Sequence, residues 1–391
     1  MSNPLLQSTK LPPFSSIKPE HIQPAIEQAI ANCRAKIEQV LKQTDGFSWE
    51  NLVAPLDEVD DQLGKIWSPI SHMNSVVSND AWREAHDACL PLLSEYGTFV
   101  GQHQGLYQAY KSLATSAEFK GYSQAQKKLI DNSLRDFELS GIGLSDDDKL
   151  RYGELVKRMS ELTSSFSNQL LDATQAWSKL ITDEAELKGL PESAVAAAAA
   201  MAAAKEQQGW LFTLDFPSYL PVMTYSENRE LREECYRAFV TRASDQGPNA
   251  GEFDNGPLMD EILALRHELA NLLGFDSLAD KSLATKMAET PNQVLAFLTE
   301  LAARSKSQGE TELKELKEFA ATEYGATELA AWDLSFYAEK LKQHRYEISQ
   351  ELLRPYFPED KVLSGLFYTV SRLFGLTVAE QQEFDTWHKD V

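Results

Sequence analysis

The feature that most constrains the fold is an apolar repeat that runs without a break through the second quarter of the chain. Its members recur every three or four residues, and they are Leu155, Met159, Leu162, Phe166, Leu170, Ala173 and Trp177. Residues at this spacing share one face of an α-helix. Counted from Ser145, about 33 residues at 1.5 Å each give a helix of roughly 50 Å, longer than a compact small domain is wide. We therefore expect a spine helix with Phe166 and Leu170 in the core.

Helical spacing continues along nearly all of the remaining chain. The expected helices cover residues 22–41, 48–66, 79–113, 124–139, 193–204, 226–243, 257–273, 290–325, 333–349 and 361–374. One segment changes period, because Trp210, Phe212, Leu214 and Phe216 alternate with other side chains and so predict a strand. The sequence predicts a mainly α protein with one minor β element around residues 210–216.

Charge and cysteine content exclude several classes of partner. The 391 residues carry a formal net charge of −22, which repels the phosphates of nucleic acids and of anionic membrane surfaces. Cys33, Cys89 and Cys235 are few and widely spaced, which suits a reducing compartment. No segment has the pattern of a signal peptide or the length of a membrane span. We expect a soluble, cytoplasmic protein that binds neither nucleic acid nor membrane.

The motif closest to catalytic chemistry is His-Glu-Leu-Ala-Asn at residues 267–271. It differs by one residue from HExxH, in which two histidines four apart on a helix bind one zinc ion beside a glutamate base. The second histidine is replaced here by Asn271, and an amide is a poor zinc ligand. We therefore interpret His267 and Glu268 as part of a solvated or ion-paired helix face.

Other catalytic patterns are missing from the sequence. The remaining histidines form no pair at ligand spacing, no glycine-rich phosphate loop follows a strand, and no GxSxG elbow or cysteine–histidine nucleophile motif occurs. The sequence thus predicts no catalytic, cofactor-binding or metal-binding residue.

Seven segments, taken together and in order, resemble a known family. They are FSNQLLDAT (166–174), DQGPNAG (245–251), ILALRHELANLLGF (262–275), LATKMAETPNQVLAFL (283–298), AWDLSFYAEKLKQ (331–343), RPYFPEDKVLSGLFYTVSRLFGL (354–376) and WHKDV (387–391). Their order is that of the zinc-dependent oligopeptidases of the thimet family, and the resemblance extends from about Asn3 to Val391.

The resemblance implies an elongated assembly of two helical lobes flanking a channel that admits short peptides. Residues 1–143 are then expected in the first lobe, 144–348 in the second, and 349–391 in a segment that returns to the first. The family's HExxH helix, its third zinc ligand and its transition-state tyrosine and histidine lie beyond the part that this chain resembles. The chain is therefore expected to be an N-terminal, channel-forming portion, inactive without zinc and without the C-terminal catalytic region.

The resemblance also implies that one apolar stripe loses its covering in this chain. The stripe consists of Leu363, Leu366, Phe367, Val370 and Phe374, which in the family packs within the catalytic lobe. We expect it to be exposed. Two alternatives stay open: a non-catalytic helical scaffold or peptide-binding protein with an acidic groove, and an enzyme with a different site.

Overall fold

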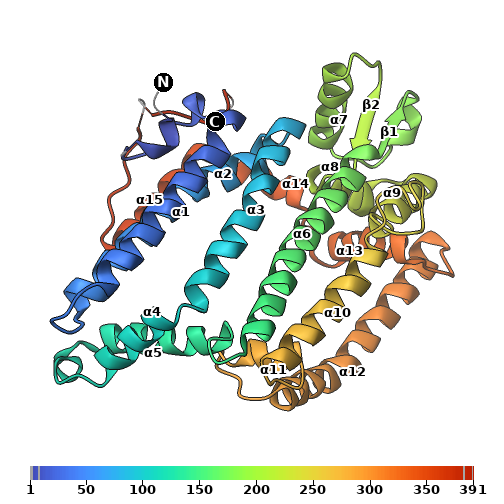
Figure 1. The fold of residues 1–391 in the computed structure, drawn as a ribbon. Helices are drawn as coiled ribbons and strands as arrows, with labels where there is room; N and C mark the ends of the chain where they lie inside the picture. The colour runs from blue at the N-terminus through green and yellow to red at the C-terminus, as the bar shows by residue number, and fades with distance from the viewer. Residues whose placement is uncertain (1–2, 8, 382–383, 390) are drawn as a thin grey trace. The chain divides into compact units, whose positions relative to one another are not determined.

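The computed structural model describes residues 3–7, 9–381, 384–389 and 391, and these residues are mainly α-helical, as predicted (Figure 1). The helices are α1 (Pro19–Leu41), α2 (Ala54–Val76), α3 (Asp80–Gly101), α4 (Gln104–Ala114), α5 (Gln124–Leu139), α6 (Asp146–Ala176), α7 (Glu192–Ala204), α8 (Phe216–Tyr225), α9 (Arg229–Val240), α10 (Gly256–Leu272), α11 (Leu278–Leu283), α12 (Pro291–Tyr324), α13 (Ala331–Tyr346), α14 (Gln350–Leu353) and α15 (Glu359–Phe374). The strands are β1 (Ser178–Ile181) and β2 (Trp210–Thr213). Among the described residues, none of these helices combines the length and the apolarity that crossing a bilayer requires.

The chain divides into two compact units. Unit 1 comprises residues 1–165, 261–287 and 381–391, and unit 2 comprises residues 166–260 and 288–380. The chain passes from one unit to the other within α6 and within α10. The division into lobes at residues 143 and 348, which the resemblance implies, stays a prediction.

Unit 1 is built on α1, α2 and α3, which lie side by side (Figure 1). Their apolar faces bury Ile22, Ile26 and Ile70 completely. A second apolar cluster joins them to α4 and α5 through fully buried residues such as Leu106 and Ile130. Burial of this kind stabilises each side chain by about 1.5–3 kcal/mol relative to its exposed state.

The helix expected over residues 79–113 is two helices in the structure. It breaks after Gly101, where a Cβ atom would lie 2.5 Å from the Cβ of Ser140. His103 then caps α4, because its Nδ1 accepts a hydrogen bond from the backbone N–H of Leu106 at 3.2 Å. The periodicity of the apolar residues continues across this break, so it did not reveal the cap.

The long helix α6 forms as predicted, but its apolar stripe is not buried along its whole length. Leu155 is 1% exposed and packs with Leu269, and Trp177, just beyond the helix, is buried in a cluster of unit 2. Between these clusters Phe166 is only half-buried, and Leu170 is 37% exposed. The expectation that Leu170 belongs to the core is therefore wrong, because it packs in neither cluster, whereas Leu162 and Ala173 on the same stripe are 2% and 3% exposed.

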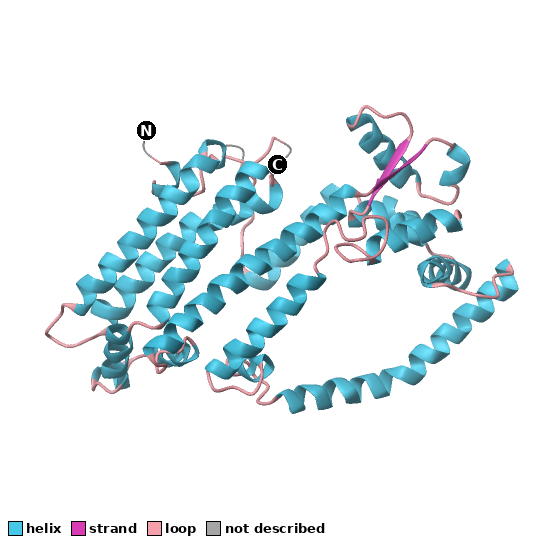
Figure 2. Ribbon diagram, turned by 45° about the vertical axis from the view of Figure 1, so that its right-hand side comes forward, coloured by secondary structure: helices cyan, strands magenta, loops and turns pink. Residues whose placement is uncertain are grey.

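The predicted strand exists, although it is shorter than expected and has a partner that the sequence analysis missed. β2 pairs antiparallel with β1, with Ile181 opposite Trp210 (Figure 2). The segment Ser178–Ile181 has too little alternation of apolar and polar residues to predict a strand. Phe216 does not continue β2 but begins α8, since Pro217 in the first helical turn favours a helix start.

Two further expectations concern unit 2. The expected helix over residues 226–243 is α9, which is shorter and capped by the Asn228 side chain, and α8 precedes it. The stripe on α15 is solvent-exposed at Leu363, Leu366, Phe367 and Phe374, as predicted, while Val370 is partly buried.

Candidate functional site

The near-match to a zinc motif lies on an exposed face of α10 in unit 1. His267 Nε2 is 3.0 Å from Asn271 Nδ2, so the amide occupies the side of the ring where a second imidazole would be needed. The carboxylate of Glu268 accepts hydrogen bonds from Arg151 Nε at 2.6 Å and Nη2 at 2.9 Å. This ion pair confirms the interpretation of the motif as an ion-paired face.

The same ion pairing makes Glu268 a weaker candidate base. Hydrogen bonding from Arg151 holds the pKa of the Glu268 carboxyl below its ordinary value, whereas a general base at neutral pH needs a raised one. A second pair repeats the geometry on the same two helices, because Arg158 donates to Glu261 at 2.6 and 2.9 Å. The polar face of α10 thus connects it to α6 within unit 1.

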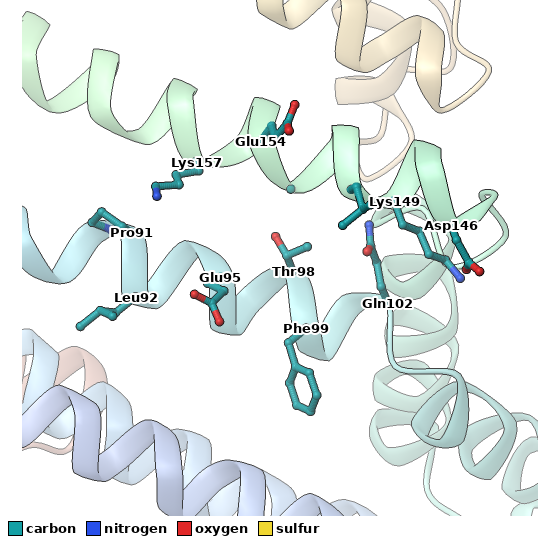
Figure 3. A pocket seen from close by; sticks show the side chains of 12 residues that line it. Pro91, Leu92, Glu95, Thr98, Phe99, Gln102, Asp146, Lys149, Glu154 and Lys157 are labelled. Atoms are coloured by element: carbon teal, nitrogen blue, oxygen red, sulfur yellow. The ribbon is translucent and has the colours of Figure 1, made fainter.

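A groove of about 700 Å³ lies between α3 and the start of α6, also in unit 1 (Figure 3). Glu95 and Thr98 line it from α3 and Gln102 from the residue just after that helix, and Lys149 and Lys157 line it from α6. Its charges have both signs, and its lining includes no histidine or cysteine. Among these lining residues, no nucleophile is paired with a base.

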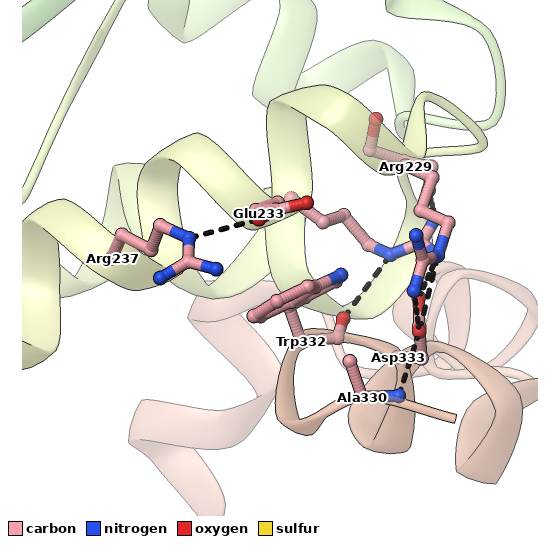
Figure 4. Close-up of polar contacts among 8 residues, drawn as sticks. Arg229, Glu233, Arg237, Ala330, Trp332 and Asp333 are labelled. Atoms are coloured by element: carbon pink, nitrogen blue, oxygen red, sulfur yellow. Dashed lines mark hydrogen bonds and ion pairs between the residues drawn. The ribbon is translucent and has the colours of Figure 1, made fainter. Parts of the chain in front are cut away.

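Among the described residues, the most buried charges form a cluster in unit 2, between α9 and the start of α13 (Figure 4). Arg232 and Asp333 have side chains only 2% and 1% exposed, and Arg232 Nη2 donates to Asp333 Oδ1 at 2.7 Å. Arg229 donates to the other oxygen at 2.8 Å, and the backbone N–H of Ala330 does so at 3.0 Å. Arg232 also donates to the carbonyl oxygens of Ser226 and Trp332.

The electrostatics of this cluster indicate a structural role. Burial raises the pKa of the Asp333 carboxyl, but hydrogen bonds from Arg229 and Arg232 outweigh it, and the pKa is lowered overall. Both carboxylate oxygens are occupied by groups of the chain itself. Sequence reasoning missed this pair, since Arg232 and Asp333 are far apart in the chain; the one local signal was Asp333 in the first turn of a helix.

The three cysteines are free thiols and all are buried. Burial raises the pKa of Cys89 to about 11 and that of Cys235 to about 12. Since the thiolate is the nucleophilic form, neither residue is activated for catalysis. Within the described part of the chain, no group of three or more His, Cys, Asp or Glu side chains is arranged to hold a metal ion. That the chain contains no catalytic residue stays a prediction.

Comparison with known proteins finds two matching family profiles. Peptidase family M3 matches residues 222–391, and the N-terminal domain of neurolysin and thimet oligopeptidase matches residues 26–149.

Curated relatives match the chain along its whole length. Oligopeptidase A of Haemophilus influenzae is 62% identical over 391 residues, which are 100% of this chain and 57% of that protein. Oligopeptidase A of Escherichia coli is 59% identical over 391 residues, covering 58% of that protein. A probable cytosolic oligopeptidase A of Arabidopsis thaliana is 37% identical over 401 aligned residues, covering 56% of that protein. The chain therefore spans a little over half the length of these relatives.

Proposed function

We propose, from the premise that this chain belongs to peptidase family M3, that it is the channel-forming portion of a zinc oligopeptidase that degrades short peptides. The observation that carries this proposal is the identity of 62% with a bacterial oligopeptidase A along all 391 residues. Because only 57% of that relative is covered, the proposal extends from this chain to a longer protein.

The chemistry supports an assignment of catalysis to residues outside 1–391. Zinc-dependent peptide hydrolysis needs a metal held by three protein ligands with an open position for the attacking water. It also needs a base within reach of that water and a donor directed at the developing oxyanion. The nearest approach in the chain is the α10 motif, which offers one imidazole at His267 and a glutamate already held by Arg151. We infer that the chain alone neither binds zinc at a built site nor cleaves peptides.

The role of the chain in the longer protein is assigned from its resemblance to the thimet family. We assign residues 1–143 to one lobe, 144–348 to a second, and 349–391 to a segment returning to the first, with the channel between the lobes. The net charge of −22 favours basic peptides by electrostatic attraction. The three free, buried cysteines fit a cytoplasmic location, where thiols stay reduced.

The test compares the 391-residue chain with the longer protein. After dialysis, each is analysed for metal content and incubated with an internally quenched peptide, with and without added zinc and with a chelator. We expect stoichiometric zinc and chelator-sensitive cleavage for the longer protein alone. If neither form cleaves peptides, a non-catalytic peptide-binding scaffold becomes the better assignment.

A histidine variant makes the test specific to the α10 motif. His267→Ala is compared with His344→Ala, which alters another exposed helical histidine. If the 391-residue chain bound one zinc ion and its cleavage disappeared only in His267→Ala, the assignment of catalysis outside this chain would be wrong.

A further inference from the structure

A second cavity in unit 1, separate from the α3–α6 groove and from the α10 face, has the features of a binding site. Its volume is about 680 Å³, and residues from α1 to α5 line it. Asp60, Gly64 and Trp67 lie on one face of α2, since their positions i, i+4 and i+7 share a side of the helix. Tyr96 and Gly97 face them from α3.

The charge in this cavity is negative. Asp60 and Asp136 are the acidic residues of its lining, which includes no lysine or arginine. Asp136 is paired with its neighbour Arg135 at 2.8 Å. Asp60 instead accepts a hydrogen bond from the neutral Tyr96 hydroxyl at 2.9 Å. Asp60 is an exposed residue at the mouth of the cavity, yet partial desolvation raises the pKa of its carboxyl. The hydrogen bond from Tyr96 lowers this pKa by less, and the nearby Asp57 raises it further.

Aromatic side chains line the same cavity as this carboxylate, and two of them are held in place. Trp67 stacks on His86 with ring centroids 4.8 Å apart, and His86 Nδ1 lies 3.0 Å from Asp87 Oδ1. Tyr96 is buried and is fixed by its hydrogen bond to Asp60. Tyr110 also lines the cavity, from α4. The faces of such rings attract cations, and their area accommodates an apolar body.

Two of the residues that line the cavity are glycines within helices. A Cβ atom added at Gly64 or at Gly97 would meet no heavy atom within 4 Å. Glycine inside a helix is less stable than alanine, and neither position needs glycine to avoid a clash or to reach a positive φ. The space in front of these two residues is therefore free, and a larger side chain at either position would project into it.

We propose that this cavity binds a small organic cation, an ammonium group on an aromatic or aliphatic body. The ammonium group pairs with Asp60, and the apolar body lies against Trp67 and Tyr96. The cavity shares no lining residue with the α10 motif or with the groove beside α6, although different residues of α3 line both the cavity and the groove. The proposed site is therefore independent of the proposed peptidase function.

The first experiment varies the ligand and leaves the protein unchanged. The 391-residue chain is titrated by calorimetry with 2-phenylethylammonium chloride, with the neutral isostere 2-phenylethanol and with the anion 3-phenylpropionate. For a ligand of this size we expect one site with a Kd of about 1 mM or tighter. The alcohol should bind at least about tenfold more weakly, and the anion should not bind, because each lacks the charge that Asp60 pairs with. Equal affinity for the amine and the alcohol, or no saturable binding of the amine, would overturn the proposal.

Matched variants then locate the site. Asp60→Asn should weaken amine binding at least about tenfold, while Asp61→Asn, which alters the exposed neighbour paired with Lys65, should leave it unchanged. Gly97→Leu should fill the cavity and abolish binding. Gly309→Leu places the same side chain on another helix with free space around it and should have no effect. Far-UV circular dichroism checks that each variant is folded. Unchanged amine binding in both folded Asp60→Asn and Gly97→Leu would show that the amine does not bind here.

Discussion

Removal of the buried carboxylate at Asp333 is the sharpest test of how unit 2 is held together. In Asp333→Ala the guanidinium of Arg232, 2% exposed, loses the carboxylate that it contacts at 2.7 Å. Breaking a buried ion pair by removing one partner costs about 3–5 kcal/mol, because a charge is left buried without compensation. The backbone N–H at the start of α13 also loses its acceptor, and loss of a helix cap adds about 1 kcal/mol.

Arg229→Ala supplies a matched control, since Arg229 binds the same carboxylate from the surface. Its side chain is 54% exposed, and exposed ion pairs contribute about 0–1 kcal/mol. The double variant Arg232→Met with Asp333→Leu should be more stable than Asp333→Ala, because it removes both charges together.

The measurement combines urea unfolding, followed by circular dichroism, with hydrogen exchange of the α9 and α13 amides. Hydrogen exchange measures the local opening of individual helices. This local measurement is needed because the chain has two units, which need not unfold together. We expect Asp333→Ala to lose protection in both helices and Arg229→Ala to keep it. Equal and small losses in the two variants, below about 1 kcal/mol, would refute the claim that the buried pair is decisive.

The pH dependence of this cluster follows from the lowered pKa of Asp333. A carboxyl whose pKa is lower in the folded state stabilises the fold above its unfolded pKa, about 3.9, and that contribution is lost as the pH falls through the folded value. The stability difference between the unaltered chain and Asp333→Ala should therefore be constant near neutral pH and shrink below about pH 4.

Two further predictions concern the thiols and the C-terminal helix. The thiols of Cys33, Cys89 and Cys235 are buried and have raised pKa values. A water-soluble alkylating reagent at pH 8 should therefore modify them slowly in the native protein and quickly in denaturant, as measured by mass spectrometry. Fast labelling of the native protein would contradict their burial. The exposed stripe on α15 should bind a hydrophobic dye and raise the fluorescence of that dye. The double variant Leu366→Ser with Phe374→Ser should reduce the dye fluorescence. Absence of dye binding by the unaltered chain would contradict this prediction.

The sequence by itself determined the helical class, and it did so through interactions between neighbours in the chain. α12 is the clearest example. The Thr290 side chain accepts a hydrogen bond from the N–H of Gln293, and Gly325 ends the helix with φ of 69°. Both signals act over a few residues, so they are visible in one dimension. The interpretation of the near-match at His267 rests on the same kind of local signal, because a helix places residues four apart on one face; that the motif holds no metal stays a prediction.

Tertiary structure decided which helical faces are buried and which charges are paired. The stripe on α6 reads uniformly apolar, yet Leu155 is buried and Leu170 is exposed, because burial depends on what packs against each turn. Arg232 and Asp333 lie 101 residues apart and form one ion pair only after α9 and α13 meet. The cavity around Asp60 requires residues from five helices. Spacing along a chain sets the direction of a side chain from its own helix, while its partners are set by contacts between distant segments, which local patterns do not specify.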